Sequence, residues 1–103
     1  MMESEKEEKL IRLERKIEEQ EDTIWQIDRT LNALDEYNQQ MTRYMQSAAA
    51  FCQPGDYAYE EIMTTLQDTH RIHEDGRDFW TKEKRVIRAG IDDAEYEKKK
   101  MKK

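Results

Sequence analysis

Two histidines and one cysteine are the residues of this chain most able to do chemistry. His70 and His73 stand three residues apart, so on a helix both imidazoles would share a face that could in principle bind zinc. The spacing supplies no third ligand and lacks the order of a helical zinc-protease motif. Cys52, the single cysteine, would need a base beside it to act as a nucleophile, and both histidines lie far along the chain. We therefore predict no catalytic, cofactor-binding or metal-binding residue, and we expect that the protein is not an enzyme.

The composition indicates one all-α domain with little material for a globular core. Of the 103 residues, 41% are charged and 36% are apolar, and the mean hydropathy is -1.20. Three glycines and one proline offer few turns, and β-branched residues are too few for a sheet. The net charge of -6 argues against nucleic acid as a partner, because phosphate contacts need a basic surface. The charged first residues lack the apolar run of a secretory signal, so we expect a soluble, cytoplasmic protein without membrane insertion.

The first half of the chain carries an apolar series with alternating spacings of three and four residues. This period is typical of a helix whose narrow stripe packs against another helix. We predict a helix from about residue 3 to 51. Its seam consists of Leu10, Leu13, Ile17, Gln20, Ile24, Ile27, Leu31, Leu34, Asn38, Met41, Met45 and Ala48. Asn38 is the most informative of these, since a polar seam residue either fixes the register or faces solvent where the seam is loose.

A short break at residues 52–56 separates this helix from a second one, predicted from about residue 57 to 100. Pro54 disfavours helix at the residue before it, and Gly55 readily takes positive φ. Asp56 is expected to cap the second helix by accepting from backbone amides two or three residues further on. Gly76 and Gly90 lie inside that helix, where each marks either a kink or a close approach of the two helices.

The second helix carries a strict seven-residue series and, beside it, a neighbouring apolar series of Ile72, Phe79 and Val86. The main series is Tyr59, Leu66, His73, Trp80, Ile87, Ala94 and Met101, with Ile62 beside it near the turn. Folding back at the break brings the acidic start of the chain beside the lysines at its end, which favours an antiparallel pair. We therefore predict that residues 1–103 form a single helical-hairpin domain resembling a coiled coil.

Several large apolar side chains fall outside the main seams and widen the apolar stripe beyond what one partner helix covers. Aromatic residues are enriched among the anchors of protein interfaces. The alternative is that these residues broaden the hairpin's own seam or lie singly on its surface. We predict a partner-binding set of Trp25, Tyr37, Tyr44, Phe51, Ile72, Phe79 and Val86, together with the seam residue Trp80 beside Phe79.

In these features the whole chain resembles the small α-helical hairpin proteins associated with LXG-domain toxins of type VII secretion in Gram-positive bacteria. The resemblance is carried by the charged start, the break Phe51-Cys52-Gln53-Pro54-Gly55-Asp56, the pair Phe79-Trp80 and the ending Asp92-Asp93-Ala94-Glu95-Tyr96-Glu97-Lys98. The Trp-x-Gly turn of the wider WXG family is missing. So is a C-terminal export signal of the form Tyr or Phe-x-x-x-Asp, since Glu83 follows Phe79 and Lys100 follows Tyr96 at that spacing.

The resemblance implies an accessory protein that packs lengthwise against the helical N-terminal LXG domain of a toxin and supports its export. A second small helical protein would then carry the export signal, and the chain would stay in the cytoplasm or leave with its partner. The competing hypothesis is a self-associating coiled-coil protein, in which two hairpins form a homodimeric four-helix bundle.

Overall fold

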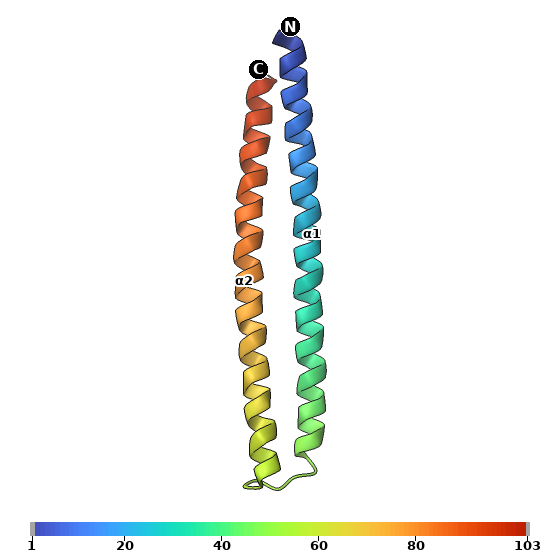
Figure 1. The fold of residues 1–103 in the computed structure, drawn as a ribbon, viewed down its shortest axis with the longest axis vertical. Coiled ribbons are helices and arrows are strands. Elements are labelled where there is room, and N and C mark those ends of the chain that lie inside the picture. Colours follow the sequence, from blue (N-terminus) through green and yellow to red (C-terminus); the bar gives the residue numbers. More distant parts are fainter. Residues whose placement is uncertain (1, 103) are drawn as a thin grey trace. The chain divides into compact units, whose positions relative to one another are not determined.

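The computed structural model describes residues 2–102, and two long helices are the only regular elements in that part of the chain. Helix α1 spans Met2–Ala49 and helix α2 spans Tyr57–Met101 (Figure 1). Helix α1 has no glycine or proline and consists largely of Glu, Gln, Lys, Arg and Leu, which lose little side-chain freedom in a helix. The predicted all-α fold with two helices in an antiparallel hairpin is confirmed.

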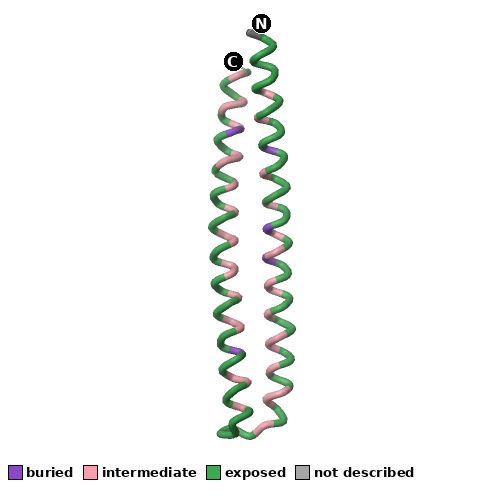
Figure 2. Tube along the Cα trace, in the orientation of Figure 1, coloured by how far each residue is buried: buried purple, intermediate pink, exposed green. Residues whose placement is uncertain are grey.

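The chain divides into two compact units, each made of one segment of α1 and one segment of α2. The terminal unit comprises Met1–Asp28 and Thr81–Lys103, and the turn unit comprises Arg29–Trp80. Within each unit the two helical segments run antiparallel (Figure 1). Buried and half-buried residues in each unit lie on the sides of the segments that face each other (Figure 2).

The terminal unit has the tighter seam. Ile17, Ile27 and Ala94 keep 6%, 3% and 3% of their surface exposed. One lysine of the basic end forms an ion pair with α1, because Lys98 Nζ lies 3.5 Å from Oε1 of Glu14, which follows the acidic start of the chain. Acidic and basic residues from both ends also line one pocket, whose members are Glu3, Lys6, Glu7, Leu10, Met101 and Lys102.

The turn unit has a looser seam with a polar centre. Leu31 and Leu66 are its buried hydrophobic residues, and each keeps 9% of its surface exposed. Asn38 is half-buried and accepts a hydrogen bond from His70 Nδ1 at 3.0 Å. The seam residue Asn38 therefore pairs across the two helices.

The break between the helices differs from its prediction in two details. Helix α1 ends at Ala49, two residues before Phe51. The amides of Phe51 and Cys52 then donate to the carbonyls three residues earlier, those of Ala48 and Ala49. Helices often end in such a tightened turn, which takes up carbonyls left without an α-helical partner. The carboxylate of Asp56 accepts the amide of Gln53 at 3.0 Å, so it closes the turn instead of capping the amides that follow it. Gly55 has a φ of 98°, as expected for the turn glycine.

Candidate partner-binding surface

The turn unit carries a pocket bordered by exposed apolar side chains from both helices. Tyr37 of α1 and Ile72 of α2 line it together with Thr69 and the seam residues Leu34, Asn38 and His73. Tyr37 keeps 59% of its surface exposed and Ile72 keeps 65%. The structure therefore brings two members of the predicted partner-binding set together, beside the seam and open to solvent.

On the opposite flank of the turn unit, an ion-pair cluster links the two helices. Asp35 Oδ1 accepts a hydrogen bond from His73 Nε2 at 2.7 Å, and Arg77 donates to both oxygens of the same carboxylate at 2.7 Å. These bonds from His73 and then Arg77 hold the pKa of the Asp35 carboxyl below its ordinary value of 3.8. Asp35 and Tyr37 stand two residues apart on α1, so they leave the helix on nearly opposite sides. Asp35 thus lies on the flank opposite Tyr37, while His73 both lines the apolar pocket and bonds to Asp35.

Phe79 and Trp80 form one aromatic pair at the end of the turn unit. Their ring centroids lie 5.0 Å apart and the ring planes meet at 81°, an edge-to-face arrangement. Phe79 keeps 54% of its surface exposed, whereas Trp80 is half-buried and belongs to the main seam series of α2. The pair therefore extends from the seam to the surface, and Phe79 is its accessible member.

The remaining predicted residues are also exposed but occupy different places. Tyr44 lies on α1 one heptad after Tyr37, and Phe51 follows the end of that helix with 93% of its surface exposed. Val86 belongs to the terminal unit and keeps 68% of its surface exposed. Exposure makes all three available to a partner, although none of them lines the pocket of Tyr37 and Ile72.

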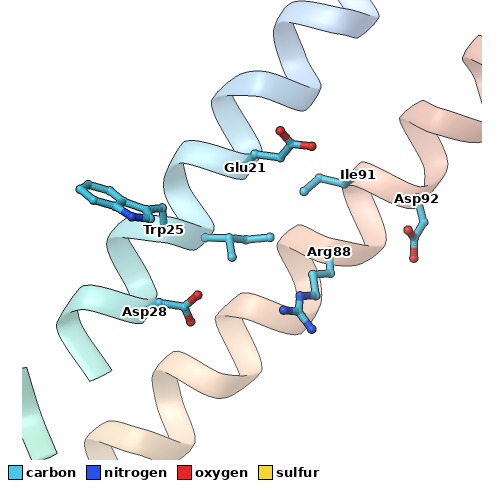
Figure 3. Close-up of a pocket in the computed structure, with 7 residues that line it drawn as sticks. Glu21, Trp25, Asp28, Arg88, Ile91 and Asp92 are labelled. Carbon is cyan, nitrogen blue, oxygen red and sulfur yellow. The ribbon is translucent and has the colours of Figure 1, made fainter. Parts of the chain in front are cut away.

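Trp25 lies in the terminal unit, in a pocket with a charged rim. Its neighbours there are Glu21, Ile24, Asp28, Arg88, Ile91 and Asp92. Figure 3 shows Ile91 directed toward α1 and the indole of Trp25 directed away from α2. Asp28 also accepts a hydrogen bond from Lys84 of α2. Trp25 is thus part of a separate pocket, lined by two isoleucines and four charged side chains.

Both glycines inside α2 mark close approaches between helices. A Cβ atom at Gly76 would lie 3.2 Å from Cδ1 of Leu34, and one at Gly90 would lie 2.7 Å from Nε2 of Gln20. Helix α2 continues through both positions. Of the two alternatives drawn from the sequence, the structure therefore supports the close approach. Gln20 is a seam residue as predicted, and its Oε1 is buried without a hydrogen-bond partner.

Sequence reasoning overlooked one feature of this surface, a row of exposed carboxylates beside Ile72. Glu61, Asp68 and Asp75 recur at intervals of seven residues along α2, and all three are exposed. Their spacing could have revealed the row, because residues seven apart on a helix lie almost in line. The row borders the apolar pocket on its α2 side, because Asp68 and Asp75 are one turn before and after Ile72.

Among residues 2–102, no three His, Cys, Asp or Glu side chains are grouped as ligands for a metal ion. His70 and His73 instead bond to Asn38 and Asp35. Over the same residues, neither helix has a stretch long and apolar enough to cross a membrane. Comparison of the chain with protein-family models, with curated proteins and with solved structures gave no match.

Proposed function

We propose that this protein is a non-enzymatic helical adaptor whose exposed apolar residues bind another helical protein. The observation that carries the proposal is the pocket of Tyr37 and Ile72, where two large apolar side chains from different helices stand exposed at one place. Contiguous apolar surface beside a polar rim is typical of a protein-interaction site. Phe79 and Tyr44 extend the same kind of surface along the two helices.

The resemblance to accessory proteins of LXG toxins names the partner class in this proposal. The partner would be the helical N-terminal domain of a type VII secreted toxin, held lengthwise by the hairpin to support its export as a targeting chaperone. A second small helical protein would complete the assembly. The adaptor would act in the cytoplasm or leave the cell together with its cargo.

The test is to mix the purified protein with the helical domain encoded by the neighbouring gene and to measure mass by light scattering. A complex containing one copy of each chain supports the adaptor. A homodimer of unchanged mass that ignores the neighbour contradicts it and favours the competing four-helix bundle. An exposed polar substitution such as Glu36→Gln is the control and should leave the complex intact.

A further inference from the structure

We infer that the turn unit binds an amphipathic helix with a row of lysine or arginine along one edge of its apolar stripe. This inference rests on the proposed function and names the chemistry of the partner at one surface. We call that surface the acidic-edged face. It comprises the apolar residues Tyr37, Tyr44, Ile72 and Phe79 and the acidic row Glu61, Asp68 and Asp75.

The apolar residues of this face come from two neighbouring helical segments. Tyr37 and Tyr44 follow each other at seven residues on α1, as do Ile72 and Phe79 on α2. Tyr37 and Ile72 line one pocket between the helices, and the seven-residue spacing places Tyr44 and Phe79 on the same flank of α1 and α2. A third helix placed along this flank would contact both rows at once, which is a common way to bind an amphipathic helix.

The distribution of charge on the acidic-edged face predicts which edge of the bound helix carries lysine or arginine. On the α2 side of the groove, Asp68 and Asp75 stand one turn either side of Ile72. On the α1 side, the corresponding outward positions beside Tyr37 and Tyr44 are Gln40 and Ser47, which carry no charge. Arg71 pairs with Asp68 on the α2 edge, so Glu61 and Asp75 supply the net negative charge of that edge. The complement of the face is a helix with basic residues on the side that meets α2.

The same charges disfavour a second copy of this chain as the occupant. Residues 29–80 contain nine acidic residues against four arginines, a formal charge of -5. Two of those arginines already face carboxylates of the same unit, Arg77 on Asp35 and Arg71 on Asp68 at 3.2 Å. Two turn units packed face to face would bring like charges together, which weakens association.

The experiment uses the full-length protein and two synthetic amphipathic helices of about four heptads each. Both probes carry the same leucine stripe, and one has lysine along one edge where the other has glutamate. Binding is measured by fluorescence anisotropy at low and at high salt. The lysine-edged helix should bind about fivefold more tightly at low salt, since Glu61 and Asp75 each offer an exposed ion pair that changes affinity by about two- to threefold, while Asp68 is already paired with Arg71. High salt should shrink that preference.

Charge reversal on the face provides the specific test. The triple variant Glu61→Lys, Asp68→Lys and Asp75→Lys should prefer the glutamate-edged helix. The matched control, Glu36→Lys, Glu74→Lys and Asp78→Lys, makes the same change in net charge at exposed positions off the face and should keep the original preference. Equal loss in both variants would mean attraction by net charge alone and would overturn the inference. Equal affinity of the unaltered protein for the two probes, or no binding of either, would overturn it too.

An apolar variant keeps the test decisive should charge reversal disturb folding. Ile72→Ser should weaken binding of the lysine-edged helix at least tenfold. Ile11→Ser changes a similarly exposed isoleucine of the terminal unit and should have no effect. Binding of the lysine-edged helix without any complex with the neighbouring gene's product contradicts the adaptor proposal alone. A complex with that product that forms equally well with the charge-reversed triple variant contradicts this inference alone.

Discussion

The contact between Gln20 and Gly90 gives a prediction whose size follows from the structure. A methyl group added at Gly90 would approach Nε2 of Gln20 to 2.7 Å, closer than non-bonded atoms tolerate, so the glutamine side chain must move. That movement breaks no hydrogen bond of Oε1, which is buried without a partner. The contact therefore opposes alanine by steric crowding at the end of one flexible side chain.

Two opposing effects set the expected free-energy change. Replacing glycine by alanine inside a helix stabilises it by about 1 kcal/mol. Forcing Gln20 away from its preferred rotamer costs about 0.5 to 1.5 kcal/mol. For Gly90→Ala alone we therefore expect a change in unfolding free energy within about 0.5 kcal/mol of zero. In a Gln20→Ala background the crowding is gone, and the same substitution should stabilise the protein by about 1 kcal/mol.

The assay is a double-mutant cycle on these two positions, with unfolding free energies from urea titrations followed by circular dichroism. The expected coupling between Gln20 and Gly90 is about 1 kcal/mol. Gly76→Ala is the control, because Gly76 approaches Leu34 and its effect should be the same with or without Gln20. If Gly90→Ala destabilises the protein by more than about 1 kcal/mol in both backgrounds, the spacing of the helix backbones demands glycine and our reasoning is wrong.

Three further predictions concern acid stability, the aromatic pair and the turn. The hydrogen bond from His73 lowers the pKa of Asp35, so the ionised carboxylate stabilises the fold above pH 3.8, and this stabilisation is lost as the pH falls through the lowered pKa. Asp35→Asn should therefore weaken the dependence of the unfolding free energy on acid pH in urea titrations. Parallel curves of unfolding free energy against pH for the two proteins would contradict this. Phe79→Ala should weaken partner binding by more than about 1 kcal/mol in calorimetry, whereas Trp80→Ala should destabilise the free chain by about 2 kcal/mol. Gly55→Ala should cost about 1 kcal/mol in thermal unfolding because φ is 98° there and no atom crowds the site; an unchanged melting temperature would show that the turn relaxes.

The helices and their seam could be predicted because a single periodicity specifies both. Every residue of the predicted α1 seam, from Leu10 to Ala48, is buried or half-buried in the structure. In α2 the residues of the main series are also buried or half-buried, while Ile72, Phe79 and Val86 of the neighbouring series are exposed. The pattern determines burial in this way because a residue's rotational position on a helix follows from its number alone.

The partners of seam residues could not be predicted in the same way. A heptad pattern repeats every seven residues, so it leaves the register between two helices open by whole heptads. The bond of Asp35 to His73 and Arg77 depends on that register, which the length of the turn sets. Sequence reasoning therefore placed His73 on the seam and noted that Asn38 was polar there, yet found neither of their partners.

Apart from Trp80, the predicted partner-binding residues were chosen because they lie off the seam, without regard to the side of the seam on which each one lies. Trp25 follows the seam residue Ile24, whereas Tyr37 precedes the seam residue Asn38, so the two rings leave the seam in opposite rotational senses. The structure accordingly finds them in two different pockets. Adding the sign of the rotation to the sequence pattern would have grouped Tyr37 with Tyr44 and separated both from Trp25.

In the turn unit, polar residues occupy part of the seam and large apolar residues stand exposed beside it. This arrangement favours binding of a partner over the stability of the unit alone. Its seam includes Asn38 and His73, whose polar contacts help to set a register while contributing little net stability. Its exposed Tyr37 and Ile72 contribute about 25 cal/mol for each Å² of apolar surface only once something covers them. A partner that covers this face would therefore add apolar burial that the seam of the unit lacks. The register set by the polar contacts would keep the exposed apolar residues of α1 and α2 side by side for that partner. On this reasoning the free energy of binding comes from the side chains outside the seam, and the polar contacts inside the seam determine where those side chains stand.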